Sequence, residues 1–330
     1  MKIAVVILNW NGAKLLQQFL PSVVSYSQEA NVFVADNAST DDSVNDVKAN
    51  FPSVQIIRNK DNYGFAKGYN DALKNLDYDI FALVNSDIEV TENWLQPILE
   101  KFQNEPKVAI IQPKIRDFKN KDFFEYAGAA GGYIDQYGFP FCRGRIFDTV
   151  EKDLNQYDDE TEIFWASGAC FFIRSSVFRQ LGGFDEDFFA HQEEIDLCWR
   201  AINCGNQIRY TSKSLVFHVG GATLQQGNPK KTYLNFRNSL LMLVKNLPKK
   251  RLFLIIFIRL CLDGLAGIQF IFQGKPKHTF AIVQAHYSFY SLIGRFLKKR
   301  GGHQIDSYFK IKSIVYLYFI KKQTIFGKNS

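Results

Sequence analysis

The stretch KIAVVILNWNG, residues 2–12, is the starting point for interpreting the fold. Its apolar run from Ile3 to Leu8 is too short for the core of a signal peptide, and Asn9 follows at once. A short apolar run bounded by polar and glycine residues is typical of a strand buried in a sheet. We therefore predict a buried strand here.

Strand and helix patterns alternate through the next 80 or so residues. Residues 13–25, for example, have apolar side chains at helical spacing, with Pro21 as an expected kink. This alternation predicts an α/β fold with a doubly wound, Rossmann-like, mostly parallel sheet and right-handed crossovers. The predicted order is strand 2–8, helix 13–25, strand 31–36, helix 39–50, strand 54–59, helix 64–76 and strand 79–87.

Each of these predicted strands ends in a polar side chain. The terminal residues are Asn9, Asp36, Asn59 and the group Asn85–Asp87. In open α/β sheets ligands bind beyond the carboxyl ends of the strands, so we expect a shared ligand crevice at this edge. Further along, residues 107–145 are glycine-rich and irregular and are interpreted as loops around a site, and a later strand ends at His218.

The composition limits the class of protein. With 46% hydrophobic and 15% aromatic residues, the 330-residue chain can bury a substantial core. Its five cysteines are an odd number without a C-x-x-C pair, which favours a reducing compartment over a disulfide framework or a structural zinc site. Neither a P-loop nor a G-x-G-x-x-G follows the first strand, so a dinucleotide site is not expected.

Four residues near the strand ends have both a ligand-binding and a structural interpretation. Asp36 could bind a ribose hydroxyl or a base N–H of a ligand, or it could form an Asx-turn within the chain. Lys67, between two glycines at a helix start, suits phosphate, or is a solvated lysine beside a glycine turn. Asp87, with Glu89 two residues on, suits a divalent cation, and His218 would add a nitrogen ligand unless it is a core histidine.

The acidic stretch FFAHQEEIDLCWR spans residues 188–200 and has helical spacing. Glu193, Asp196 and Arg200 fall on one stripe, and acids at a helix N-terminus are favourable, so Glu193 and Asp196 are explained by structure. Glu194 belongs to neither the charged nor the buried stripe. Crowding and burial would raise its proton affinity, which makes Glu194 the preferred candidate for a general base among the three acids.

Several motifs occur in a characteristic order: VVILNWNG, FVADNASTDDS, NYGFAKGYN, LVNSD, SGACFFIRSSVF, GGFDEDFFAHQEEIDLCWR and FHVGG. Over about residues 1–245 the chain resembles the family 2 glycosyltransferases, of the bacterial rhamnosyltransferase-like kind. The resemblance implies a GT-A fold, a nucleotide-sugar donor such as a UDP- or dTDP-sugar, Mg²⁺ or Mn²⁺, and an inverting mechanism. Residues 246–330 would form a separate C-terminal region.

The resemblance also implies roles for individual residues. Asp87 matches the last acid of the family's metal motif, with Asn85 in place of the first, so the metal would depend on Asp87 with help from His218 or Glu89. Glu194 matches the second acid of the "ED" pair, the expected base, and the choice between it and Glu193 stays open. The nucleoside pocket would be lined by Asn9, Asn11 and Asp36, and the base and diphosphate would lie near Asn62, Gly64 and Lys67.

The C-terminal region is strongly basic. Residues 245–330 hold 16 Lys and Arg against two acids, a net charge of +14, whereas the other residues carry −7. Residues 252–272 are long and apolar enough to cross a bilayer, but they include Arg259 and Asp263, so we expect helices that lie in the interface of an anionic membrane. The alternative is an amphipathic helical domain packed on the catalytic core.

The function expected from this reasoning is sugar transfer to a hydroxyl of a lipid-linked glycan in bacterial surface polysaccharide synthesis. The enzyme would be cytoplasmic and peripheral on the inner face of the cell membrane. One alternative is a polyprenyl-phosphate glycosyltransferase, for which Arg143, Arg145 and Arg237 could serve as acceptor cations. Others are a non-catalytic nucleotide-sugar-binding protein and a nucleic-acid-binding protein. The last is disfavoured because long apolar runs separate the basic residues, and no nucleic-acid partner is expected.

Overall fold

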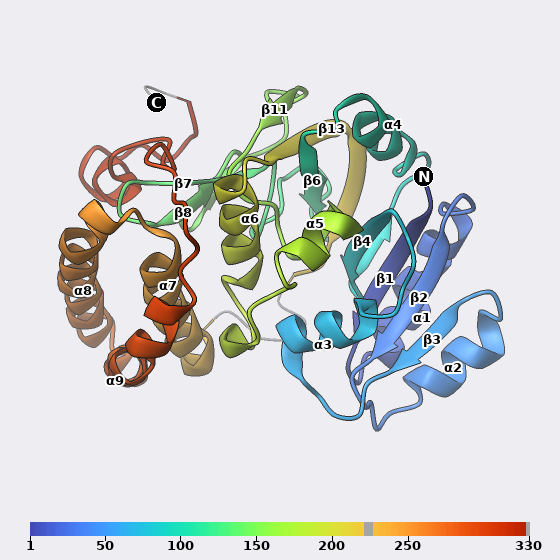
Figure 1. Ribbon diagram of the computed structural model, residues 1–330, viewed down its shortest axis with the longest axis horizontal. Helices are drawn as coiled ribbons and strands as arrows, with labels where there is room; N and C mark the ends of the chain where they lie inside the picture. The colour runs from blue at the N-terminus through green and yellow to red at the C-terminus, as the bar shows by residue number, and fades with distance from the viewer. Residues whose placement is uncertain (221–226, 328–330) are drawn as a thin grey trace.

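The computed structural model describes residues 1–220 and 227–327 and has a mixed α/β architecture (Figure 1). Its main sheet has the order β11-β13-β6-β12-β4-β1-β2-β3, with β5 paired to β13. Strands β3, β2, β1 and β4 are parallel, whereas β12 runs antiparallel to both β4 and β6. The strands are β1 Ile3–Asn9, β2 Asn31–Asp36, β3 Gln55–Arg58, β4 Ile80–Asn85, β5 Ile88–Val90, β6 Val108–Asp117, β11 Glu160–Glu162, β12 Cys170–Arg174 and β13 Gln207–His218.

Helices cover both faces of this sheet, as expected for a doubly wound fold. One apolar core contains Leu16 and Leu20 of α1 and Ile98 of α4, and the other contains Tyr69 of α3 and Trp199 of α6. The helices of this part are α1 Ala13–Ser25, α2 Ser43–Asn50, α3 Gly64–Leu73, α4 Gln96–Asn104, α5 Ser175–Gln180 and α6 Glu193–Asn203, with a 3₁₀ turn at Glu186–Phe188.

The strand and helix order predicted for residues 2–87 is confirmed, with small shifts at the ends. The helix expected from residue 39 begins at Ser43, because Ser39 is used in a turn in which its N–H donates to Asp36. The interpretation of residues 107–145 as loops was wrong, since it missed β6. Pro113 lies inside that strand, at a register shift in its pairing with β13, which is where a proline is tolerated.

Residues 118–131 are a loop, and residues 132–150 contribute a small antiparallel sheet of β7 Gly132–Ile134, β8 Pro140–Cys142, β9 Arg145–Ile146 and β10 Thr149–Val150. The C-terminal tail returns over this sheet. Asp135 forms a bridge with Ile311, and the rings of Tyr133 and Phe326 stack with their centroids 5.5 Å apart. Residues 301–315 are therefore an extended strap rather than a helix, apart from a helical start near Ile314.

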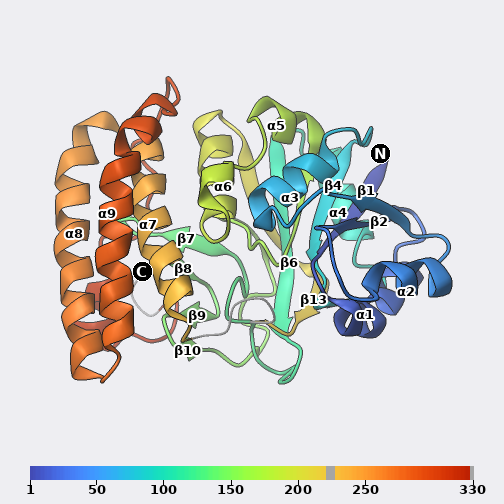
Figure 2. The same ribbon diagram turned by 90° about the horizontal axis from the view of Figure 1, so that it is seen from below.

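Three long helices, α7 Pro229–Asn246, α8 Lys249–Phe272 and α9 Pro276–Lys298, lie side by side at one end of the molecule (Figure 2). Helix α8 is long and apolar enough to cross a membrane by length and composition. Arg259 and Asp263 are both buried, and Arg259 donates to the Gly138 carbonyl at 3.2 Å and to Ser239 at 2.8 Å. The charged face of α8 thus packs on the protein, and its opposite face is exposed.

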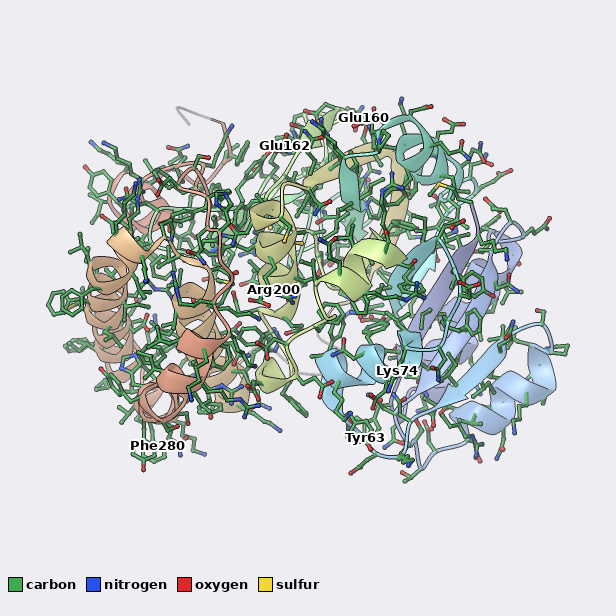
Figure 3. The ribbon with its side chains drawn as sticks, viewed as in Figure 1. Tyr63, Lys74, Glu160, Glu162, Arg200 and Phe280 are labelled. Carbon is green, nitrogen blue, oxygen red and sulfur yellow. The ribbon has the colours of Figure 1, made fainter. Side chains whose placement is uncertain are left out.

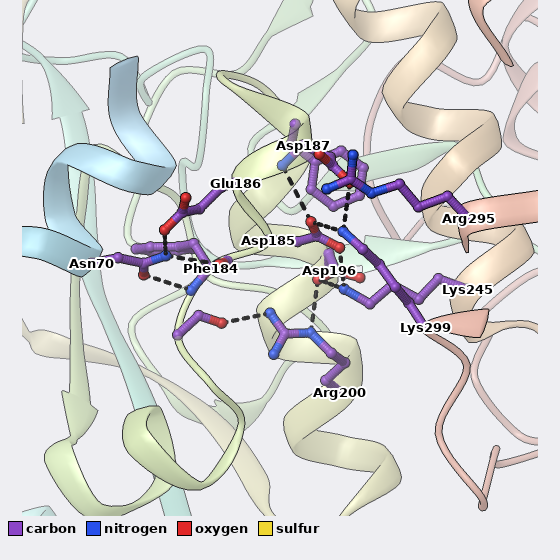
Figure 4. Close-up of polar contacts among 12 residues, drawn as sticks. Asn70, Phe184, Asp185, Glu186, Asp187, Asp196, Arg200, Lys245, Arg295 and Lys299 are labelled. Atoms are coloured by element: carbon purple, nitrogen blue, oxygen red, sulfur yellow. Dashed lines mark hydrogen bonds and ion pairs between the residues drawn. The ribbon is translucent and has the colours of Figure 1, made fainter. Parts of the chain in front are cut away.

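Part of the basic excess of residues 245–330 is paired with acids of the first 244 residues (Figure 4). Lys245 Nζ lies 2.8 Å from Asp185 and 2.9 Å from Asp196, and Lys299 pairs with both Asp185 and Asp187. These cations therefore neutralise acids of the N-terminal part of the chain instead of facing outward.

Candidate active site

The polar residues at the strand ends come together at one edge of the sheet, as predicted. The Asn9 side-chain amide donates to Asp36 at 3.1 Å and to Ser43 at 3.0 Å. Asn59 donates to Asn37 at 2.6 Å, and Asn37 in turn donates to the Gly64 carbonyl at 2.9 Å. Asn37, which was not singled out from the sequence, therefore links β2, the end of β3 and the start of α3.

The other proposed nucleotide-binding residues surround the same edge. Asn11 has a φ of 51° and accepts a hydrogen bond from the Thr40 N–H at 2.7 Å. Asn62 accepts from the Gly64 N–H at 3.1 Å, which shapes the glycine turn before α3. Lys67 is half-buried and pairs with Asp71 at 2.8 Å, so a phosphate would have to compete with that carboxylate.

Asp87, His218 and Glu125 form a buried row at the same edge. His218 Nε2 lies 3.1 Å from Asp87 Oδ1, and Nδ1 lies 3.2 Å from Glu125 Oε1. Burial would lower the pKa of His218, but the charges of Glu125 and Asp87 outweigh it and raise the pKa to about 10. Burial would raise the pKa of Asp87, but His218 outweighs it and holds that pKa below its ordinary value.

This row would fit a divalent cation that displaces the proton held on His218 Nε2. Asp87 Oδ1 and His218 Nε2 converge, and a histidine that binds metal through one ring nitrogen usually has the other oriented by a carboxylate, here Glu125. Across residues 1–220 and 227–327, no three His, Cys, Asp or Glu side chains form a ready metal cluster. A cation would thus have two protein ligands and would need oxygens of the nucleotide, which is common for Mg²⁺.

Glu89 does not join this row. It lies opposite Phe217 in the β5–β13 pair, and the next residue along, His218, points to the other face of the sheet. Its carboxylate pairs with Lys121, whose ammonium also lies 4.3 Å from the Phe217 ring. The structure therefore brings Asp87 and His218 together and leaves Glu89 on the opposite face.

The acids at the start of α6 have distinct surroundings. Glu194 is partly exposed, but its Oε2 is buried without a hydrogen-bond partner among the residues that the structure describes. Burial raises the pKa of Glu194 to about 7, and burial together with the Glu194 charge raises the pKa of Glu193 well above its ordinary value. Asp196 is different, because Arg200, Lys245 and Asn246 outweigh its burial and lower its pKa to about 2. A carboxylate with a pKa of about 7 can exchange a proton at neutral pH.

The loop before α6 has an unusual backbone. Phe189, His191 and Gln192 have φ values of 63°, 69° and 74°, a region that side chains other than glycine seldom adopt. The buried Asn238 of α7 donates to the carbonyls of Phe188, Ala190 and His191 at 3.0, 2.9 and 2.8 Å. Asn238 therefore holds the loop that places Glu193 and Glu194, a role that no local sequence pattern indicated.

Close packing connects the Asp87–His218 row with Glu194. A Cβ atom at Gly128 would lie 2.3 Å from the Ser167 Cβ, and one at Gly168 would lie 3.7 Å from the Glu194 carboxyl carbon. Gly128 follows Glu125 closely in the chain, and Gly168 follows Ser167 directly. Ser167 and Gly168 are therefore packed between Gly128 and the Glu194 carboxylate.

The arginines suggested for a phosphate acceptor are engaged elsewhere. Arg143 makes two hydrogen bonds to Asp159, at 2.8 and 2.7 Å. Arg145 donates to the Tyr126 carbonyl at 2.7 Å, and Arg237 donates to the Phe188 carbonyl at 3.2 Å. All three stabilise loops, which gives no support to the polyprenyl-phosphate alternative.

The mostly parallel central sheet with helices on both faces is the GT-A fold of solved glycosyltransferases. The model of the family "Glycosyl transferase family 2" matches residues 4–182, so the chain belongs to this family.

Known proteins of this architecture are similar to the chain. N-acetylglucosaminyl-diphospho-decaprenol L-rhamnosyltransferase of Mycobacterium tuberculosis is 26% identical over 233 residues, which are 65% of this chain and 75% of that protein. GalNAc-T7, solved with UDP, GalNAc and Mn²⁺, has a TM-score of 0.59 at 18% identity, over 74% of this chain and 48% of that one. S. aureus TarS 1-349 with UDP-GlcNAc has a TM-score of 0.59 at 15% identity, over 91% and 84%.

Proposed function

We propose that the protein is an inverting glycosyltransferase that moves a sugar from a UDP- or dTDP-sugar to a hydroxyl of a lipid-linked glycan, in the synthesis of bacterial surface polysaccharide. The observation that supports this proposal is Glu194, whose pKa is raised to about 7 and whose carboxyl carbon would lie 3.7 Å from a Cβ atom at Gly168. The donor class is supported by the GalNAc-T7 and TarS structures, which hold UDP or UDP-GlcNAc.

On the donor side, Asn9, Asn11 and Asp36 would bind the nucleoside, and Asn62, Gly64 and Lys67 would lie near base and diphosphate. Asp87 and His218 would hold Mg²⁺ or Mn²⁺, a choice supported by the Mn²⁺ in the GalNAc-T7 structure. When bound, the cation would neutralise charge on the departing diphosphate. Glu125 would keep His218 Nε2 directed at Asp87, and the Asp71 partner of Lys67 would yield to the phosphates.

On the acceptor side, the hydroxyl oxygen of the acceptor would attack the anomeric carbon from the face opposite the nucleotide. Glu194 would take the proton of that hydroxyl during the attack. A base must be ionised before it can act, and a pKa near the working pH gives a large ionised fraction together with good proton affinity. Glu193, whose pKa is also raised, would carry the proton that the crowded pair retains, which limits repulsion with Glu194.

The rate is expected to depend on pH through Glu194. Because the active form is the carboxylate and its pKa is about 7, kcat should fall about tenfold for each pH unit below 7 and level off above 8. The measurement is kcat from pH 5.5 to 8.5 at saturating donor, acceptor and Mn²⁺. A profile that stays flat down to pH 5.5 would show that no base of this kind limits turnover.

Replacing Asn238 is expected to harm turnover more than donor binding. Asn238→Leu keeps the volume but leaves three carbonyls of the strained loop without their shared donor, so the start of α6 should shift. We expect kcat to fall at least tenfold while the affinity for donor with Mn²⁺, measured by calorimetry, stays within twofold. The neighbouring Ser239→Ala variant, which touches Arg259 instead, should keep its kcat; equal losses in both variants would indicate general damage to α7.

The acceptor is proposed to be membrane-bound. The M. tuberculosis relative is by its name a transferase to a diphospho-decaprenol-linked sugar. The outer face of α8 exposes a continuous apolar stripe from Phe253, 86% exposed, to Phe272, 87% exposed, which is the pattern of a helix that lies along a membrane surface. Exposed lysines at both ends, among them Lys249 and Lys275, would favour anionic lipid and a cytoplasmic, peripheral location.

Vesicle flotation tests the membrane surface. The full chain is expected to float with vesicles containing anionic lipid at low salt, and Phe253→Glu combined with Leu265→Glu should reduce the bound fraction at least tenfold. Leu154→Glu changes an equally exposed leucine far from α8 in the sequence and should have no effect. Point variants are preferable to removal of the C-terminal region, because removal would strip the cationic partners from Asp185 and Asp187. A wild-type chain that does not float with the vesicles at low salt would exclude the membrane proposal.

A thermal-shift screen of UDP-, dTDP- and GDP-sugars, each with and without Mn²⁺, tests the donor class. A ligand at 100 times its dissociation constant stabilises the folded state by about 2.7 kcal/mol, which is readily seen as a higher Tm. We expect stabilisation by a UDP- or dTDP-sugar only when Mn²⁺ is present. Absence of any shift across the screen would contradict the proposal.

A further inference from the structure

An apolar groove of about 1030 Å³ runs between the first turns of α7 and the first half of α9. Its walls include Tyr233 of α7 and Phe280, Val283 and Tyr287 of α9, and its rim carries Lys230 and Lys277. Phe280, 63% exposed, projects from α9 at the margin of the molecule (Figure 3). None of these residues takes part in the donor site or in proton transfer.

The shape of the groove is fixed by contacts beneath it. Thr232 lies 2.7 Å from His278 Nδ1, and the Tyr233 hydroxyl donates to Ser288 at 2.9 Å, so the two helices are held together along the groove. Ala281, which is buried between them, is too small to fill the space. Because helical residues rise 1.5 Å each, the α9 wall from Pro276 to Ser288 is about 18 Å long.

The two ends of the groove differ in charge. Thr232 and His278 meet near the beginnings of α7 and α9, while Arg300 beyond α9 donates to the carbonyl of Leu247 beyond α7. The helices therefore run in the same direction, as Figure 2 shows, and their N-terminal ends, with partial positive charge, share the rim with Lys230 and Lys277. This end suits an anion, whereas the remainder suits hydrocarbon.

The cationic end of the groove also adjoins the loop that precedes α6. Lys230 Nζ lies 5.5 Å from the centre of the Phe189 ring. Phe189 is the first positive-φ residue of the loop that leads into Glu193 and Glu194, and its carbonyl accepts from the Phe65 N–H of α3 at 3.1 Å. A ligand with its phosphate at this rim would carry any attached sugar toward the edge that holds Glu194.

We propose that this groove binds the hydrocarbon chain of a phosphate-bearing lipid acceptor, with Lys230 and Lys277 at the phosphate end. The inference rests on the proposed glycosyltransferase function and adds where the acceptor's lipid is held. Apolar side chains line a length sufficient for part of an extended hydrocarbon chain, cations lie where the chain meets its phosphate, and the outer stripe of α8 beside α9 gives continuity with a bilayer surface.

Calorimetric titration of the full chain with farnesyl phosphate tests this site, with inorganic phosphate as the probe for the charge alone. We expect saturable binding of farnesyl phosphate and at least tenfold weaker binding of inorganic phosphate. Val283→Glu puts a charge in the groove and should lower the affinity for farnesyl phosphate at least tenfold. Lys230→Gln should lower that affinity about threefold to tenfold. The matched control Leu265→Glu, on the outer stripe of α8, should bind farnesyl phosphate within twofold of the wild-type affinity. All variants should bind donor and Mn²⁺ like the wild type.

Three results would overturn the proposal. One is the absence of saturable farnesyl phosphate binding. A second is an equal loss of farnesyl phosphate affinity in Val283→Glu and Leu265→Glu, which would make the groove only part of a general membrane-contact face. The third is a change from dimer to monomer in Val283→Glu on sedimentation, which would make the groove an interface between copies. Failure of the glycosyltransferase proposal would appear separately, as a wild-type chain that binds farnesyl phosphate but no nucleotide-sugar.

Discussion

Asp87→Ala is expected to abolish the Mn²⁺-dependent part of nucleotide-sugar binding. Asp87 is the buried carboxylate that meets His218 Nε2 at 3.1 Å, and with it gone His218 is the one remaining protein ligand of the proposed cation. Loss of an outer-shell partner alone costs about 10- to 100-fold in metal affinity, so loss of a direct ligand should cost about 100-fold or more. Calorimetric titration of the donor with and without Mn²⁺ measures the effect.

Glu89→Ala is the matched control for Asp87→Ala. Glu89 lies two residues further along the chain but faces the other side of the sheet, paired with Lys121. The Glu89→Ala variant should therefore bind donor and Mn²⁺ like the wild type. Unchanged affinity in Asp87→Ala would remove Asp87 from the cation site, and an equal loss in both variants would point to disruption of the β4–β5 turn instead.

Glu194→Gln is expected to lower turnover by about 10²–10⁴-fold while donor binding persists, because the amide cannot accept the proton of the acceptor hydroxyl. Single-turnover transfer at pH 8 measures the chemical step, and calorimetry measures donor binding. Glu193→Gln is the comparison that resolves the choice between the two acids. Near-normal turnover in Glu194→Gln together with a large loss in Glu193→Gln would transfer the role of base to Glu193.

Stability distinguishes a lost base from a damaged fold in Glu194→Gln. The folded-state pKa of Glu194, about 7, is above its ordinary value of 4.5, so the folded state binds more protons between these pH values. Stability is therefore lost as pH rises through that window, and the uncharged amide removes this loss. Glu194→Gln should accordingly melt at a higher temperature than the wild type at pH 8, with a smaller difference at pH 5. A lower melting temperature at pH 8 would mean that the variant is simply misfolded.

The sequence predicted the sheet edge well because its signals are local. Each apolar run stops at a polar residue, and parallel strands bring their ends together, so the sequence alone was enough to group Asn9, Asp36 and Asp87. Strand β6 was missed because Pro113 argues against a strand unless its partner has an irregularity, and that irregularity lies in β13, about 100 residues later.

The parts of the site that were not predicted depend on contacts between distant residues. Glu125 meets His218, and Asn238 meets a loop some 50 residues earlier, so neither has a recognisable spacing. Glu89 was grouped with Asp87 because it lies two residues further along the chain, as alternate residues of one strand would. Ser86 and Asp87 form a turn between β4 and β5, which breaks that rule.

The charge of the C-terminal region shows the same limit. Its net charge is visible in the sequence, but the pairing of Lys245 with Asp185 and Asp196, or of Lys299 with Asp187, is not. These buried and half-buried pairs attach α7 and the end of α9 to the segment that precedes Glu194. The basic region is therefore in part a support for the segment around the start of α6.

The stereochemistry of transfer tests the central claim most directly. The full chain would be incubated with Mn²⁺, a lipid-linked glycan acceptor and the nucleotide-sugar that gives the largest thermal shift, and the anomeric configuration of the new linkage would be read by NMR. Direct attack by a hydroxyl activated by Glu194 predicts a product with the configuration opposite to that of the donor. A product that retains the donor's configuration would contradict single displacement with Glu194 as the base.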